Sequence, residues 1–199
     1  MYRTDGPAEL KPLCEVEFVN GTAAGRAGFS RLAKLGLTFE AWGYHPQIGE
    51  FVELARAFPD TTLILNHVGG FLGVGPYASR RAEEFSRWQA SIRELAKCPN
   101  VVVKLGGLGM LIFGFDLHLG DAPPSSEQLA TAWKPFIDTC IEAFGPDRCM
   151  FESNFPVDKQ SCDYTACCNA FKRLSAGASA AEKTALFSET AGRVYRPAV

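Results

Sequence analysis

The chain has 199 residues, of which 47% are hydrophobic and 21% are charged, and its formal net charge is -2. This composition is that of one globular domain with enough apolar side chains to form a core. The lysines and arginines are scattered along the chain, which argues against a nucleic-acid-binding surface. No apolar run reaches the ~18 residues of a membrane span, and the N-terminal residues contain no apolar signal region, so we predict a cytoplasmic protein.

The seven cysteines show no Cys-x-x-Cys spacing. An odd number of cysteines without that spacing predicts neither a disulfide framework nor a zinc site. A reducing compartment agrees with this usage.

Four segments repeat one pattern, in which a short β-rich run is followed by a Gly, Pro or polar break and then by an amphipathic stretch. The predicted strands cover residues 37–42, 62–66, 101–105 and 149–153, and the predicted helices cover residues 47–58, 78–96, 126–144, 164–174 and 180–187. This alternation is typical of βα units. Because the runs are apolar on both faces, they belong in a mostly parallel sheet with helices outside, which predicts an α/β fold.

The first 36 residues are less regular than the rest. Residues 14–19 are one candidate strand, and residues 27–35 are a candidate helix. We therefore divide the chain into an irregular N-terminal segment, residues 1–36, and a βα region, residues 37–199, within a single domain.

Polar side chains stand where predicted strands end. His45 follows the first strand, His67 the second and Asn154 the fourth, and Lys104 lies near the end of the third. Groups at the carboxyl ends of parallel strands converge on one rim, where ligands bind. Taken alone, each histidine is more often a hydrogen-bonded structural residue than a site residue, and Lys104 can equally extend its amine to solvent.

The same stretches resemble consecutive barrel segments of the amidohydrolase-related (amidohydrolase family 2, lactonase-like) TIM-barrel hydrolases. They are Phe39-Glu-Ala-Trp-Gly-Tyr-His-Pro-Gln47, Leu63-Ile-Leu-Asn-His-Val-Gly-Gly70, Asn100-Val-Val-Val-Lys-Leu-Gly-Gly107 and Phe144-Gly-Pro-Asp-Arg-Cys-Met-Phe-Glu-Ser-Asn-Phe-Pro156. The ending Glu189-Thr-Ala-Gly-Arg-Val-Tyr195 resembles the family's C-terminal helix. The resemblance covers about residues 35–196.

The resemblance implies a partial TIM-type barrel whose four strands are the last four of eight. By position, His45 matches the strand-five histidine, a metal ligand in many members, and His67 matches the strand-six histidine, which binds metal or polarises the attacking water. Asn154 stands where many members carry an aspartate that acts as ligand and general base. We assign catalytic roles to His67, Asn154 and Lys104, with Lys104 orienting an anionic group. The candidate substrate-binding residues are Trp42, Tyr44 and Asp158.

Two departures from the family pattern bear on the metal. The His-x-His pair of the first barrel strand has no counterpart, because the histidines of the chain are His45, His67 and His118. Asn154 is a neutral amide that cannot take a proton from water. A catalytic zinc needs about three protein ligands and an open position. The zinc or manganese of the family is therefore not expected to bind tightly here. Glu152 or Asp158 could supply the carboxylate, although Glu152 lies inside the predicted strand and could point away.

The length of the chain is itself informative. A TIM barrel typically takes about 250 residues, and the four predicted βα units already use most of this chain. We therefore expect a truncated barrel, whose open strand edges and apolar inner face would favour association of two copies.

The resemblance implies hydrolysis of a lactone, ester or amide of a small molecule, incomplete or absent in the truncated form. A decarboxylase of the same family is the alternative enzyme. A non-catalytic fragment or regulatory partner is the alternative of a different class. Neither a nucleic acid nor a membrane is an expected partner.

Overall fold

The computed structural model describes residues 23–195. Its sheet contains four strands, β1 (Phe39–Ala41), β2 (Leu63–Leu65), β3 (Val101–Leu105) and β4 (Cys149–Phe151), in the spatial order β1-β2-β3-β4. All three neighbouring pairs are parallel. Each strand lies inside the run predicted for it, so the α/β fold with a parallel sheet is confirmed.

The α-helices also follow the predicted pattern. They are α2 (Ala23–Phe29), α3 (Ile48–Ala57), α4 (Arg81–Leu95), α5 (Ser126–Phe144), α6 (Tyr164–Leu174), α7 (Ala180–Thr184) and α8 (Thr190–Tyr195), and a π-helical turn, Ala185–Glu189, joins α7 to α8. The candidate helix at residues 27–35 is replaced by α2 and a short 3-10 turn, Ala33–Leu35. The candidate strand at residues 14–19 lies outside the described residues. Within residues 23–195, no helix has the length and apolar character needed to cross a membrane.

Local sequence fixes where the longer helices begin. Ser125 accepts a hydrogen bond from the backbone N–H of Gln128, and the Gln128 side chain accepts one from the backbone N–H of Ser125, which forms a capping box at the start of α5. Asp163 accepts a 2.7 Å bond from the backbone N–H of Ala166 at the start of α6. Such caps satisfy backbone donors that have no partner within the helix.

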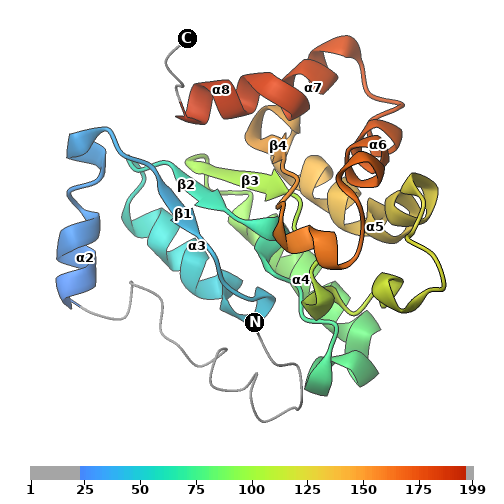
Figure 1. Cartoon of the computed structure of the whole chain (residues 1–199). Helices are drawn as coiled ribbons and strands as arrows, with labels where there is room; N and C mark the ends of the chain where they lie inside the picture. Colours follow the sequence, from blue (N-terminus) through green and yellow to red (C-terminus); the bar gives the residue numbers. More distant parts are fainter. Residues whose placement is uncertain (1–22, 196–199) are drawn as a thin grey trace.

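The two faces of the sheet are covered by different parts of the chain. The outer face carries Leu63, Val103 and Cys149 into a large core with apolar residues of α3, α4 and α5. The inner face carries Ile64 and Val102, together with Met150, into a small cluster with Val194 of α8. Figure 1 shows the α7–α8 arm lying across the side of the sheet opposite α3 and α4.

This arm corrects the expectation of an exposed inner face. Ile64, Val102 and Met150 are buried, and they pack against Val194 of α8. Burying these side chains removes apolar surface from water and stabilises the half-barrel. Association of two copies is therefore not needed to cover these three side chains, and the expected homo-oligomer stays a prediction.

Candidate functional site

The backbone is strained at two of the predicted site residues. His67 and Val68 follow β2 with φ of 55° and 47°, and Asn154 follows β4 with φ of 53°. Residues other than glycine rarely adopt this left-handed region, and a β-branched residue there is an outlier. Such conformations persist only where the surrounding structure holds them, and they concentrate at functional sites. The rim after β2 and β4 therefore has the backbone character of a site.

The side chain of His67, which follows β2, is held by the carboxylate of Glu152, which follows β4 two strands away. Its Nδ1 lies 2.5 Å from Oε1 of Glu152, and the same oxygen accepts a 3.3 Å bond from the backbone N–H of His67. Both side chains are largely buried. Gly107, at a φ of 70°, makes room for the imidazole, because a Cβ there would stand 2.6 Å from Cβ of His67. The two groups thus form an oriented His–carboxylate pair.

Lys104 joins this pair to the first strand. Its Nζ lies 2.9 Å from Oε2 of Glu40 on β1 and 3.7 Å from Oε2 of Glu152. Tyr195 of α8 donates a 2.6 Å bond to the other oxygen of Glu40. Burial lowers the pKa of Lys104, but hydrogen bonds with Glu40 and Tyr195 outweigh it and raise that pKa. Burial raises the pKa of Glu40, but its bonds from Tyr195 and Lys104 hold that pKa below its usual value. Lys104 and Glu40 therefore stabilise each other's charges, and Lys104 links them to Glu152 and His67. We call Glu40, Lys104, Glu152 and His67 the rim cluster.

Asn154 and Asp158 form a second group. Nδ2 of Asn154 donates a 2.7 Å bond to Oδ1 of Asp158, and the backbone N–H of Gly109 donates a 2.9 Å bond to Oδ2. Asp158 is only 1% exposed. Burial raises its pKa to about 6, even though the bonds from Gly109 and Asn154 act in the opposite direction. A carboxylate with both oxygens engaged and almost no exposed surface does not reach a substrate. The structure argues against Asp158 as a substrate contact and favours a role in positioning Asn154.

His45 is buried, and the hydrogen-bond partners of its ring, Leu72 and Glu84, lie outside the rim cluster. Its Nδ1 accepts a 3.1 Å bond from the backbone N–H of Leu72, and its Nε2 lies 3.3 Å from Oε2 of Glu84 on α4. Glu84 in turn pairs with Arg80 and Arg87, each at 3.4 Å. Burial lowers the pKa of His45, and the bond to Glu84 opposes that shift. With both ring nitrogens engaged, neither is free to bind a metal. The geometry argues against the predicted ligand role and favours a structural one.

The aromatic residues after β1 border the His67 side chain. The Trp42 ring meets the His67 ring edge to face with 4.6 Å between centroids, and the Tyr44 ring lies 5.8 Å from that of Trp42. Trp42 is 42% exposed. An exposed aromatic ring thus lies beside His67, and the substrate-binding role of Trp42 and Tyr44 stays a prediction.

The donor set does not fit a catalytic zinc ion. In residues 23–195, no group of three or more His, Cys, Asp or Glu side chains is arranged to hold a metal. A zinc hydrolase site needs about three such ligands.

The structure gives Glu152 and Glu40 a larger part in the site than the sequence predicted. Glu152 was one of two candidate carboxylates, with its orientation left open, and Glu40 was not considered. Strand alternation indicates how Glu152 is oriented. Met150 pairs with Lys104 on the inner face, and Glu152, two positions after Met150, points to the same side.

Comparisons with known proteins agree with this architecture. The model of the amidohydrolase family (Amidohydro_2) matches residues 4–196. The chain is 40% identical to the uncharacterized protein y4mH of Sinorhizobium fredii over 195 residues, which are 98% of this chain and 58% of y4mH. It is 35% identical to an L-fucono-1,5-lactonase of Burkholderia multivorans over 111 residues, which are 55% of this chain and 35% of that enzyme.

Among solved structures, a zinc-bound amidohydrolase from Burkholderia multivorans superimposes with a TM-score of 0.72 and 24% identity, covering 99% of this chain and 72% of that one. The chain thus has the fold of part of such an enzyme and spans little more than half the length of y4mH. On the match of the family model along nearly its whole length, the chain belongs to the amidohydrolase family.

Proposed function

We propose that this chain carries the hydrolytic half of a lactonase site, in which His67 activates water for attack on the carbonyl carbon of a small-molecule lactone. The observation that carries the proposal is the contact between His67 and Glu152. The 35% identity to an L-fucono-1,5-lactonase makes a sugar-derived lactone the favoured substrate class.

The proton transfers follow from the two ring nitrogens of His67. With Nδ1–H donating to Glu152, Nε2 is the ring nitrogen that accepts a proton. A carboxylate in this position fixes the tautomer and stabilises the imidazolium that forms. Water loses a proton to Nε2 and attacks the carbonyl carbon. The tetrahedral intermediate then breaks the ring C–O bond, and the imidazolium returns the proton to the departing oxygen. The product is a hydroxy acid.

The neighbouring residues position these groups. Lys104 is already bound to Glu40 and approaches Glu152, so it balances the two carboxylates and keeps Glu152 directed at His67. It would orient an anionic substrate group by exchanging one of those contacts. Asn154 has its amide nitrogen committed to Asp158, which leaves its carbonyl oxygen to accept a bond from a substrate hydroxyl. Trp42 supplies an apolar wall beside His67.

A panel of aldono-1,5-lactones and simple esters tests the proposal. The purified chain is expected to open at least one sugar-derived 1,5-lactone faster than the buffer does, with the rate lost in His67→Gln. Activity that persists in His67→Gln with unchanged kcat/KM would contradict it.

A non-catalytic role is the second candidate, and the observation that favours it is the 58% coverage of y4mH. If the rest of the barrel must supply substrate contacts, the chain alone shows no turnover on any lactone of the panel. Turnover restored by adding a separately produced N-terminal half-barrel of a relative would then identify the chain as a complementing fragment.

A further inference from the structure

Tyr195, the last residue of α8, extends from the C-terminal helix to the rim cluster. The helix begins beside β4, where the Thr190 hydroxyl donates a 3.2 Å bond to the backbone oxygen of Asp147. It ends beside β1, where the Tyr195 hydroxyl donates a 2.6 Å bond to Oε1 of Glu40. Figure 1 shows α8 running across the strands in this direction. Tyr195 is therefore a point at which the helix meets the candidate site.

The carboxylate of Glu40 has a separate donor for each of its oxygens. Tyr195 donates to Oε1, whereas Lys104, at 2.9 Å, and the Asn66 amide, at 3.4 Å, donate to Oε2. The Glu40 side chain is 39% exposed, so it is only partly solvated. Because Lys104 and Tyr195 use different oxygens, Tyr195 can keep Glu40 in place when Lys104 moves.

The amine of Lys104 has two kinds of contact in this cluster. Its Nζ bonds to Glu40 at 2.9 Å and lies 3.7 Å from Oε2 of Glu152. It also stands 5.6 Å from the centroid of the Tyr195 ring. A cation over an aromatic ring is attracted to the whole face of the ring, without the directional requirement of a hydrogen bond. The amine can therefore turn away from Glu40 while it stays over the ring.

Turning Lys104 away removes a donor from Glu40, and the cost of this step depends on Tyr195. A partly buried carboxylate that loses a donor without replacement is destabilised. With the phenol in place, Glu40 keeps a hydrogen bond of the strong kind that charged acceptors make. Burial and the bond to Glu40 raise the pKa of Tyr195 to about 12, so the phenol remains a donor at neutral pH.

We propose that Tyr195 is a positioning residue for anionic substrates, an inference that rests on the function proposed above. Tyr195 holds Glu40 while Lys104 turns from Glu40 toward a carboxylate carried by the lactone. It acts through Glu40 and Lys104 and does not touch the reacting carbonyl. Its hydroxyl therefore affects how tightly charged lactones bind, and not the proton transfers of His67.

Binding of lactams, which the reaction does not open, tests this role without turnover. The probes are a six-membered lactam that carries a carboxylate and the same lactam with a neutral carboxamide, and the wild type should prefer the charged lactam. Tyr195→Phe keeps the ring beside Lys104 and removes only the hydroxyl. It should weaken binding of the charged lactam about fivefold more than that of the neutral one, the scale of one hydrogen bond to a charged group. NMR titration of the full chain measures the dissociation constants.

Lys104→Met completes a double-mutant cycle with Tyr195→Phe. Alone, it should abolish the preference for the charged lactam. Adding Tyr195→Phe to it should then have no further effect on that lactam, whereas a merely structural loss would lower the affinity in both backgrounds. Tyr164→Phe, at an exposed tyrosine of α6, is the matched control and should bind both lactams as the wild type does.

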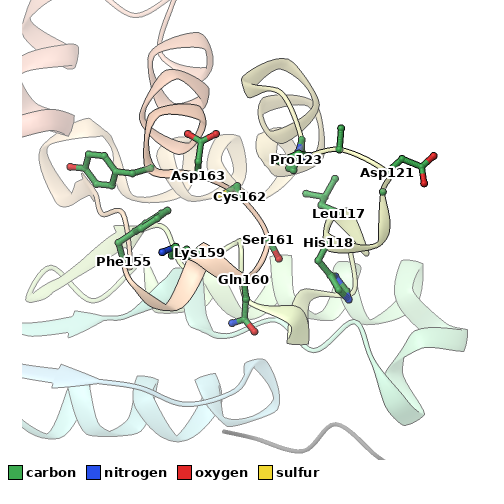
Figure 2. A pocket seen from close by; sticks show the side chains of 14 residues that line it. Leu117, His118, Asp121, Pro123, Phe155, Lys159, Gln160, Ser161, Cys162 and Asp163 are labelled. Carbon is green, nitrogen blue, oxygen red and sulfur yellow. The ribbon is translucent and has the colours of Figure 1, made fainter.

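Lys159 offers the charged lactam another place to bind. It lines a pocket of about 620 Å³ between the loop that follows β3 and the loop that follows β4. Figure 2 shows Lys159 beside Phe155, with Leu117 on the other side of the pocket. Lys104 and Tyr195 do not line this pocket. Loss of the preference for the charged lactam in Lys159→Met instead of Lys104→Met would overturn the proposal.

Kinetics separate the role of Tyr195 from the function on which it rests. In Tyr195→Phe, the KM of a 1,5-lactone that carries a carboxylate should rise about fivefold more than the KM of a neutral aldono-1,5-lactone, with little change in kcat. Absence of turnover on every lactone would contradict the proposed function, and the lactam measurements would still decide the role of Tyr195. A wild type without preference for the charged lactam, or a Tyr195→Phe variant with the wild-type preference, would overturn that role.

Discussion

His45 and His67 follow neighbouring strands, and each meets a glutamate from a distant part of the chain, yet their surroundings differ. Both ring nitrogens of His45 have hydrogen-bond partners, and the residue is only 3% exposed. His67 sits on a left-handed backbone beside an exposed tryptophan, and only its Nδ1 is bound by a described residue. A histidine at the end of a barrel strand can thus act as a general base only when one of its ring nitrogens is left without a hydrogen-bond partner.

The largest expected effect comes from His67→Gln. Loss of the general base should lower kcat/KM on a reactive lactone about 1,000-fold, within the range of such catalysis. The fold should be retained, because glutamine keeps a donor for Glu152. Initial rates together with thermal melting measure the two effects. His118→Gln, at an exposed position of the 3-10 turn Leu117–Leu119 outside the rim cluster, is the matched control and should keep wild-type activity. Equal losses of kcat/KM in His67→Gln and His118→Gln would contradict a specific catalytic role for His67.

The next effect belongs to His45→Ala and acts on stability. Removing the imidazole leaves Glu84 buried and deprives the backbone N–H of Leu72 of its acceptor. Losing these two buried hydrogen bonds costs about 3 kcal/mol. Urea unfolding measures this cost, and zinc titration of the same variant tests the metal assignment. We expect unchanged weak zinc binding. Loss of a stoichiometric zinc ion in His45→Ala would show that His45 is a ligand after all.

The sequence predicted elements better than orientations. The helices predicted at about residues 126–144 and 164–174 coincide with α5 and α6, whose first turns the structure shows capped by Ser125 and Asp163. The position of His67 on the rim followed from strand order alone. The engagement of His45 could not be predicted, because Glu84 lies 39 residues away on α4 and reaches it only through tertiary packing. The burial of the inner face was missed for the same reason, since it depends on where α8 docks.

The buried carboxyl of Asp158 should make the stability of the chain depend on pH. The carboxyl of Asp158 ionises near 6 in the folded chain against a reference pKa of 3.8, chiefly because it is buried. Between these two values the folded state binds the proton more tightly than the unfolded state. Stability from this group is therefore greatest below pH 4 and is lost as the pH rises through 6, by about 3 kcal/mol. The groups that act on this carboxyl include Asn154, His67 and Glu152.

Urea unfolding of the wild type and of Asp158→Asn, at intervals between pH 4 and 7, isolates this contribution. Asparagine cannot ionise, so the difference between the two curves should slope across this interval. Parallel curves would mean that Asp158 is already ionised in the folded chain at pH 4.

The smallest effect, about 30-fold in kcat, is expected for Glu152→Gln. Glutamine keeps an oxygen that can accept from Nδ1 of His67, so the ring stays oriented, but it lacks the charge that stabilises the imidazolium. The KM should change little, because Glu152 acts through His67 and not on the substrate. Glu84→Gln is the matched control at the other histidine, and it should lower stability while leaving kcat of the folded chain unchanged. Kinetics and urea unfolding of both variants test this. A fall in kcat for Glu84→Gln as large as that for Glu152→Gln would mean that the two His–Glu pairs are not functionally distinct.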